Sequence, residues 1–199
     1  VMVAFNLTGE IDEMRRRHDF VHKQGGTCVM VNLMAAGMAG MIALRHHTNL
    51  PIHAHRAGWG ALTREPLLGW SYPAWSKLWR LAGADHMHVS GLDNKFTEPN
   101  ESVIESARSL NDPLFNHAPM SALPVFSSGQ TVRQAAATLE AVGSSDLLVA
   151  AGGGIVAHPG GVAAGVKAMR QAYDAAMQKV DVAEYAEDHP ELAAALDEF

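Results

Sequence analysis

The sequence has very little cysteine: Cys28 is the only one among 199 residues. A single cysteine cannot form a disulfide within the chain, and one that lies in an apolar run is typical of a small core residue. Low cysteine usage also favours a reducing compartment. We therefore expect a cytoplasmic protein in which Cys28 is buried and unreactive.

Basic residues are also in short supply. The chain has 15 Lys and Arg against 21 Asp and Glu, which gives a formal net charge of -6. Binding to nucleic acid depends on clustered cations that neutralise successive phosphates. The acidic balance argues against a general nucleic-acid binder, so we expect no nucleic-acid partner.

Uninterrupted apolar runs of membrane-spanning length are missing too. The longest apolar stretch, residues 27–44, is broken by Asn32 and contains Gly37 and Gly40. A transmembrane helix needs about 20 consecutive apolar residues. A buried strand that leads into a helix of small residues accounts for this stretch better, so we expect no membrane association.

Short apolar runs alternate with segments of helical character. The runs are residues 1–6, 27–32, 51–56, 84–89, 123–128 and 146–152, and the clearest helical segments are residues 10–23, 73–81, 132–142 and 162–177. Strand followed by helix, repeated six times, predicts parallel strands joined by right-handed crossovers. The first run is interpreted as a buried strand, and a chain that opens inside a core element suggests a fragment of something longer.

Polar or glycine residues follow the apolar part of every run, and they decide between an open sheet and a barrel. They are Asn6, Asn32, His55, His88, Ser127 and Gly152. Functional groups at the same end of every strand are typical of an α/β (β/α)8 TIM barrel, whereas an open sheet concentrates them at one switch point. We predict a partial barrel of about six βα units over residues 1–180. Residues 181–199 form an acidic tail with a short helix at 191–196 and no chemistry.

Two His-x-His pairs lie on consecutive predicted strands, His53 with His55 and His86 with His88. Residues two apart on a strand point to the same side, so each pair shares a face. The last inward residue of a barrel strand meets the substrate. We therefore take His55 and His88 as candidate site residues and assign structural support to His53 and His86.

Two cationic side chains accompany the histidines. Arg56 follows His55 at the strand exit, and its planar guanidinium suits a phosphate or a carboxylate. Lys95 lies on a predicted loop. Gly91 and Asn94 precede it in that loop, and Phe96 follows it. Such a loop could close an ammonium group over a bound anion. The alternative for Lys95, an ordinary solvated surface lysine, stays open on the residues alone.

Two glycine-bearing loops complete the candidate site, at residues 127–131 and 150–161. Each follows a strand and leads into a helix. The backbone N–H groups of Gly152, Gly153 and Gly154 could bind phosphate oxygens near a helix N-terminus. Ser127 and Gly129 add polar and conformationally free positions on the preceding unit.

Taken in order, the motifs HAHRAG, GADHMHVSGLDNKF, LPVFSSGQ and AAGGGIVAHPGG resemble the C-terminal barrel of the RuBisCO large-subunit superfamily. The resemblance runs from residue 1 to about residue 177 and includes the seven-residue step from His88 to Lys95. It implies that His55 is the active-site histidine of the fifth barrel strand and Lys95 the lysine of a mobile loop. The substrate- and phosphate-binding residues that it implies are Arg56, His88, Ser127, Gly129, Gly152 and Gly153.

Departures from the carboxylase pattern point to the RuBisCO-like (type IV) proteins. Trp59 stands in place of a second histidine, Asn32 in place of an aspartate, and Ser128 in place of a glycine. The resemblance then implies enolate chemistry on a phosphorylated keto-sugar or keto-acid that is not a bisphosphate. The GLDNKF loop favours a 3-oxo-isoapionate 4-phosphate decarboxylase or transcarboxylase/hydrolase of apiose catabolism, with a 5-methylthioribulose 1-phosphate isomerase as the alternative.

The same resemblance implies Mg²⁺, with its ligands upstream of Val1, a homodimer, and an inactive isolated fragment. Two other functions remain as alternatives. The His-x-His pairs could hold zinc in a hydrolase. A site of this kind could also bind a phosphorylated sugar without turning it over.

Overall fold

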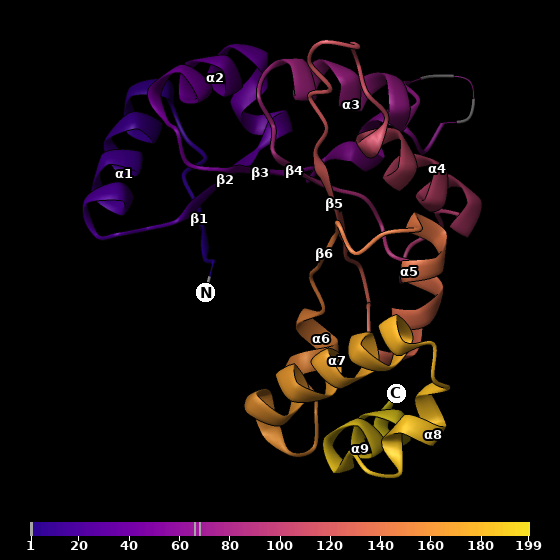
Figure 1. Cartoon of the computed structure of the whole chain (residues 1–199). Coiled ribbons are helices and arrows are strands. Elements are labelled where there is room, and N and C mark those ends of the chain that lie inside the picture. Colours follow the sequence, from indigo (N-terminus) through magenta and orange to yellow (C-terminus); the bar gives the residue numbers. More distant parts are fainter. Residues whose placement is uncertain (1, 66, 68) are drawn as a thin grey trace. The chain divides into compact units, whose positions relative to one another are not determined.

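The computed structural model describes residues 2–65, 67 and 69–199 (Figure 1). The chain divides into two compact units. The first unit comprises Val1–His88 and Arg108–Pro124, and the second comprises Val89–Ala107 and Val125–Phe199. The helix α4 (Asn100–Asn111) and the strand β5 (Leu123–Phe126) each contribute residues to both units.

The first unit contains four parallel strands that pair in chain order. They are β1 (Ala4–Asn6), β2 (Cys28–Asn32), β3 (Ile52–His55) and β4 (His86–His88). The intervening segments are α1 (Ile11–Lys23), α2 (Leu33–His47), the 3-10 helix η1 (Trp59–Leu62) and α3 (Tyr72–Leu81). Figure 1 shows α1, α2 and α3 following one side of these strands. His53 pairs with His86 in the β3–β4 register, so the two His-x-His motifs lie side by side.

The core of the first unit lies between the strands and the helices. Ile52 and Ala54 of β3 are fully buried, whereas the intervening His53 and His55 are only partly buried. This alternation places the apolar residues against the helices and the histidines on the opposite face. Cys28 is fully buried and unpaired, and burial raises the pKa of its thiol. Its predicted role as a core residue is confirmed.

The first apolar run forms a strand but not a buried one. Val3 is 49% exposed and Phe5 is 43% exposed. Among the described residues β1 pairs only with β2, which leaves its other edge and much of its surface uncovered. The interpretation of residues 1–6 as a buried strand was therefore wrong about burial, because apolar composition does not show whether a covering partner is present.

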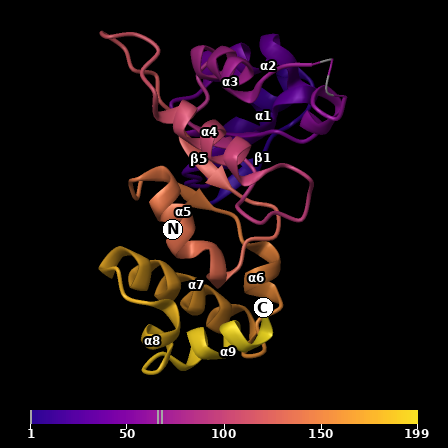
Figure 2. The ribbon, with the colours of Figure 1, turned by 90° about the vertical axis from the view of Figure 1, so that its right-hand side faces the viewer.

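The second unit contains the parallel pair formed by β5 and β6 (Leu148–Val149), with Val125 opposite Leu148. Its helical segments are η2 (Val132–Gln134), α5 (Ala135–Val142), α6 (Gly152–Val156), α7 (Gly161–Gln178), α8 (Val182–Ala186) and α9 (Pro190–Glu198). Figure 2 shows α7, α8 and α9 gathered together. Ala168 and Ala172 of α7 share a buried cluster with Leu192 and Ala195 of α9. The last helix therefore contributes to the core of this unit.

Both units are built from the same repeat. Every strand pair described joins two strands that follow each other along the chain and run parallel, with helical segments between them. This confirms the predicted α/β class with six parallel strands. The helix α4 is not among the segments that the sequence predicts, and the predicted helix over residues 132–142 is divided into η2 and α5.

Candidate functional site

Four histidines from β3 and β4 form a connected group in the first unit. The Nε2 atoms of His53 and His88 lie 2.6 Å apart, which is hydrogen-bonding distance. The ring of His55 lies 4.4 Å from that of His88, and the ring of His86 lies 5.7 Å from that of His53, centroid to centroid. The predicted sharing of one face by the two His-x-His pairs is thus seen directly, because side chains of paired strands that face the same way come into contact.

The hydrogen bond between His53 and His88 needs one ring to donate and the other to accept. Burial lowers the pKa of His88 to about 3 and that of His53 to about 4, with the neighbouring histidines adding to the effect. Both rings are therefore neutral at pH 7, and together they present a polar but uncharged surface. The expectation that His53 serves as support agrees with this contact.

The tautomer of His55 follows from one backbone contact. The Ala57 N–H donates to His55 Nδ1 at 3.0 Å, so Nδ1 must be unprotonated and the neutral ring carries its proton on Nε2. Burial, and then the positive charge of Arg56, lowers the pKa of His55. His55 is thus held as a neutral Nε2–H donor, a form suited to stabilise a developing oxyanion.

Arg56 and Tyr72 support the end of this histidine group. The guanidinium carbon of Arg56 lies 5.3 Å from the centre of the Tyr72 ring, and the Tyr72 hydroxyl donates to the His88 carbonyl oxygen at 2.6 Å. Tyr72 also contacts Trp59 edge-on, with ring centroids 5.5 Å apart. Tyr72 was not among the predicted site residues, and no motif around it marks it as part of a site.

Trp59 occupies the position where the carboxylase pattern has a histidine. It is 7% exposed and packs against Trp75, with ring centroids 4.6 Å apart. The substitution therefore turns a polar position into part of an aromatic core that includes Tyr72 and Trp79. This supports the expectation that the site differs chemically from that of the carboxylases.

The second unit brings Lys95 and the Ser127 loop together. The Lys95 N–H donates to the Ser128 carbonyl oxygen at 3.0 Å, and a Cβ built on Gly129 would lie 3.5 Å from the Cβ of Lys95. Ser127 donates its hydroxyl to the Val89 carbonyl oxygen at 3.1 Å. The side chain of Lys95 is exposed, with its ammonium 5.5 Å from the centre of the Phe96 ring. Three of the residues named by the resemblance therefore meet within this unit.

The close approach of these two loops depends on Gln130 and Gly91. Gln130 is 1% exposed and donates its side-chain amide to the Leu92 carbonyl oxygen at 2.9 Å. A Cβ on Gly91 would lie only 1.8 Å from Gln130 Nε2 and 2.5 Å from the Ser127 carbonyl oxygen. Gly91 is thus required by packing, a role that the sequence could not distinguish from loop flexibility.

Ser128 has a left-handed backbone conformation with φ 71°. This region is costly for a residue with a Cβ, so the backbone of Ser128 is strained here and a glycine would fit without that cost. Gly129 follows with φ 94°, where glycine has no such cost. The turn between β5 and η2 is therefore defined by two consecutive left-handed residues.

Gly152 and Gly153 form the first turn of α6. The N–H groups of a first helical turn have no partner within the helix, and no side chain caps this one from the Ala151 position. A Cβ built on Gly152 or Gly153 would meet no other atom of the described residues within 4 Å. Gly154 differs, because its Cβ would lie 2.6 Å from the Gln130 carbonyl oxygen. Open space thus borders the two glycines that were predicted to bind phosphate.

Asn6 and Asn32, the polar residues at the ends of β1 and β2, have local structural roles. Asn6 Oδ1 accepts hydrogen bonds from the backbone and the hydroxyl of Thr8. Asn32 Oδ1 accepts from the Met34 N–H at 3.0 Å and caps α2. Their side chains therefore serve the turns that follow the strands.

The structure does not support a zinc site in the His-x-His pairs. Within residues 2–65, 67 and 69–199, the single group of three or more metal-ligating side chains is His18, Asp19 and His47, away from β3 and β4. Nor does this part of the chain offer the oxygen-rich ligand set that Mg²⁺ prefers. Mg²⁺ ligands upstream of Val1 stay a prediction.

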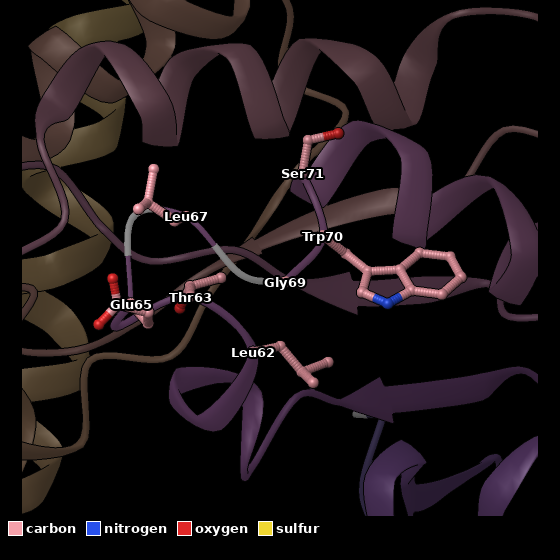
Figure 3. Close-up of a pocket in the computed structure, with 7 residues that line it drawn as sticks. All are labelled: Leu62, Thr63, Glu65, Leu67, Gly69, Trp70 and Ser71. Atoms are coloured by element: carbon pink, nitrogen blue, oxygen red, sulfur yellow. The ribbon is translucent and has the colours of Figure 1, made fainter.

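A surface hollow in the first unit is lined by Leu62, Thr63, Glu65, Leu67, Gly69, Trp70 and Ser71 (Figure 3). In the close-up, Trp70 and Leu67 project from a connecting segment, and none of the eight predicted site residues borders the hollow. It lacks the several polar side chains that gather around His55 and His88 in the first unit and around Lys95 and Ser127 in the second. The candidate site residues are therefore taken as two separate groups, one in each unit.

The chain belongs to the family described as ribulose bisphosphate carboxylase large chain, catalytic domain, whose model matches residues 1–199. This confirms the resemblance on which the site residues were chosen. The crystal structure of a rubisco-like protein from Burkholderia fungorum is 48% identical and has a TM-score of 0.97, covering 100% of this chain and 49% of that one. The partial (β/α)8 barrel is thereby confirmed as the fold class.

Two curated relatives carry more specific names. A 3-oxo-isoapionate-4-phosphate transcarboxylase/hydrolase of Xanthobacter autotrophicus is 60% identical over 196 residues, which cover 98% of this chain and 47% of the relative. A 3-oxo-isoapionate-4-phosphate decarboxylase of Rhizobium rhizogenes is 45% identical, covering 100% of this chain and 48% of the relative. The chain thus spans about half the length of the curated relatives it matches. In the described part of the chain, no helix combines the length and hydrophobicity needed to cross a bilayer.

Proposed function

We propose that this chain provides residues for the carbon–carbon bond chemistry of a 3-oxo-isoapionate 4-phosphate transcarboxylase/hydrolase. The observation that carries the proposal is the 60% identity, over 98% of the chain, to a relative of that name. The neutral histidine donors of the first unit and the lysine and glycine groups of the second unit support it.

The chemistry follows from the substrate class. In a 3-oxo acid, the bond between the carboxylate carbon and its neighbour can break because the adjacent ketone accepts the bonding electrons. Carbon dioxide separates, and the electron pair becomes an enolate whose charge lies largely on the former ketone oxygen. A decarboxylase lets the carbon dioxide go and protonates the enolate. In a transcarboxylase/hydrolase, an enolate carbon uses its electron pair to form a new bond to the carbon dioxide, and water then cleaves the resulting 3-oxo acid into two carboxylic acids. A protein promotes the formation of the enolate by placing hydrogen-bond donors at the former ketone oxygen before the reaction begins.

The first unit is proposed to stabilise the enolate and bind anionic substrate groups. His55 donates through Nε2–H, the tautomer that the Ala57 N–H imposes. His88 offers a neutral ring held in place by His53, and Arg56 supplies a fixed positive charge. A neutral imidazole is the better donor here, because an imidazolium would transfer its proton outright to an enolate.

The second unit is proposed to hold the phosphate and the carboxyl group that is displaced. Lys95 places an ammonium group on a loop that is anchored through its own backbone to Ser128. Ser127, Gly129, Gly152 and Gly153 are proposed to bind phosphate oxygens through hydroxyl and backbone N–H groups. The open space beside Gly152 and Gly153 supports that role.

Three further expectations complete the proposal. We propose that the protein uses Mg²⁺ held by residues outside this chain, that it forms a homodimer, and that it is cytoplasmic. The reported relatives are about twice as long as this chain, which supports a search for the metal ligands in sequence beyond it.

The substrate labelled with ¹³C in its carboxyl group tests the reaction in the full-length protein. A transcarboxylase/hydrolase retains the label in a carboxylic acid product, whereas a decarboxylase releases it as CO2. The decarboxylase stays the second candidate, because a relative of that name is 45% identical over the whole chain. Turnover of 5-methylthioribulose 1-phosphate but not of the 3-oxo acid would refute both.

A matched pair of lysine variants tests the proposed role of Lys95. Lys95→Met is expected to lower kcat/KM at least about a hundredfold, because a charged donor is lost where negative charge develops. Lys23→Met, at the last residue of α1, is the control and should leave kcat/KM within about twofold. Equal activity of the two variants would exclude a role for Lys95 in the reaction.

A further inference from the structure

A second cluster of potential ligands lies in the first unit, apart from β3 and β4. It consists of His18 and Asp19 on α1 and His47, the last residue of α2. The candidate ligand atoms of all three lie within 4.8 Å of one another. None of the residues in the proposed function belongs to this cluster, so it needs an explanation of its own.

The geometry is close to that of a bound metal ion. Asp19 Oδ1 lies 3.0 Å from His18 Nδ1 and 2.7 Å from His47 Nε2. Two ligand atoms about 2.0–2.1 Å from a tetrahedral Zn²⁺ are separated by about 3.3 Å. The three side chains would therefore need only small rotations to receive an ion between them.

His18 presents its Nδ1 to the cluster from a buried position. The residue is 6% exposed, and Nδ1 is the ring nitrogen that lies beside the Asp19 carboxylate. The ring is also held in place, because His22 stacks on it at 5.7 Å and His47 contacts it edge-on at 4.9 Å.

The ligand types define the ion. Two imidazole nitrogens and one carboxylate oxygen suit Zn²⁺ and its neighbours Co²⁺, Ni²⁺ and Cu²⁺. Mg²⁺ prefers an all-oxygen octahedral shell, and so it fits this cluster poorly. Asp19 and His47 are exposed at the surface, which gives an ion a path of entry.

We propose that His18, Asp19 and His47 form a binding site for a divalent transition-metal ion of the zinc class. The ion joins the middle of α1 to the C-terminal end of α2, and a water molecule completes its coordination. The site stabilises the packing of these two helices and takes no part in the reaction at β3 and β4.

Zinc titration of the full-length protein, monitored by calorimetry in the presence of excess Mg²⁺, tests the proposal. Variants Asp19→Asn and His47→Gln each remove one ligand while keeping a similar shape. His46→Gln is the matched control, because His46 is the exposed neighbour of His47 and is outside the cluster. The zinc bound by each variant is subtracted from the zinc bound by the unmodified protein. This difference excludes the contribution of any other zinc-binding residue.

The expected result is that the unmodified protein and His46→Gln bind one more Zn²⁺ per chain than the two ligand variants, or bind it at least about tenfold more tightly. Zinc should also raise the Tm of the first two proteins more than that of the ligand variants. Identical stoichiometry, affinity and Tm response in all four proteins would overturn the proposal. If Asp19→Asn does not fold, His47→Gln alone decides, because His47 is partly exposed.

Discussion

The Nε2 atoms of His53 and His88 lie 2.6 Å apart, so one proton lies in the contact between the two neutral rings. A second proton in that contact would turn one ring into a buried imidazolium and leave two N–H groups facing each other, which is strongly unfavourable. The pKa values of both rings are lowered because burial and the neighbouring histidines disfavour the charged form. The pair is therefore a neutral support beneath His55.

This pair predicts a loss of stability at mildly acidic pH. An unfolded histidine has a pKa of about 6.5, whereas the folded values are about 4 for His53 and about 3 for His88. Between these limits the unfolded state binds more protons, so the free energy of unfolding falls as pH drops from about 6.5 towards 4. The slope is up to about 1.4 kcal/mol per pH unit for each histidine. Urea unfolding at several pH values measures it.

The variant His53→Gln should make that dependence shallower, because one of the two shifted groups is removed. His46→Gln is the control, since His46 is exposed and lies at the end of α2, outside the histidine group of β3 and β4. If both variants retain the slope of the unmodified protein, the pair does not account for acid sensitivity.

Arg80 predicts a large effect on stability. It is 1% exposed and donates to the carbonyl oxygens of Met120 and Ser109, each at 2.7 Å, and to that of Asp112. Arg80→Met should lower the free energy of unfolding by about 3 kcal/mol or more, because buried carbonyl oxygens lose their donor. Lys77→Met, at an exposed position of the same helix, should change it by less than about 0.5 kcal/mol. Chemical denaturation would measure both, and equal effects would contradict the assignment.

Gly91→Ala should disrupt the second unit. Its Cβ would lie 1.8 Å from Gln130 Nε2, so the Gln130 side chain or the Lys95 loop must move. We expect a loss of at least about 2 kcal/mol in stability, together with a fall in kcat/KM. Thermal unfolding and steady-state kinetics measure the two effects, and an unaltered protein would show that the loops are not tightly packed.

Gly153→Ala should raise the stability of the protein, in contrast to Gly91→Ala. An alanine in a helix is favoured over glycine by roughly 0.5–1 kcal/mol, and the new Cβ meets no atom of the described residues within 4 Å. If phosphate binds beside this residue, KM should nevertheless rise severalfold because the methyl group obstructs it. Unchanged KM together with higher Tm would remove Gly153 from the proposed phosphate site.

Tyr72→Phe tests whether the Tyr72 hydroxyl holds His88 in position. The variant loses the hydroxyl that donates to the His88 carbonyl oxygen at 2.6 Å but keeps the ring beneath Arg56. We expect a loss of about 1 kcal/mol in stability and a measurable fall in kcat, since His88 loses a fixed position. Tyr185→Phe is the control, because its hydroxyl makes an exposed contact to Gln178. Equal kinetics for the two variants would deny Tyr72 a positioning role.

Much of the fold could be predicted because parallel strands are buried by helices and leave a strong apolar signature. Cys28–Asn32 and Ile52–His55 both lie within runs read from the sequence. The exposure of Phe5 could not be predicted, because burial depends on what covers a strand. The helix Asn100–Asn111 was not among the predicted segments, although Val103, Ala107 and Leu110 recur at helical spacing and are buried.

In the candidate site, too, some features could be predicted from the sequence and others could not. Alternation along strands was enough to place His55 and His88 on one face, and the family resemblance supplied the lysine and glycine groups. The tautomer of His55 depends on the backbone of Ala57, and the position of His88 depends on Tyr72, sixteen residues away. Contacts of this kind come from tertiary structure, so no sequence pattern announces them. That all eight residues serve one substrate stays a prediction.

The contacts of Gln130 also limit how far the loop that carries Lys95 can move. The hydrogen bond from Gln130 to the Leu92 carbonyl oxygen and the packing of Gln130 on Gly91 fix the start of this loop. Any hinge must therefore lie on the C-terminal side of Leu92. A displacement of Lys95 would then break its backbone hydrogen bond to the Ser128 carbonyl oxygen, which is worth about 1 kcal/mol, and it would also strain the hydrogen bonds from the Asn94 side chain to the Gly91 and Glu98 carbonyl oxygens. Any movement of the ammonium group is therefore expected to be confined to the residues that follow Leu92.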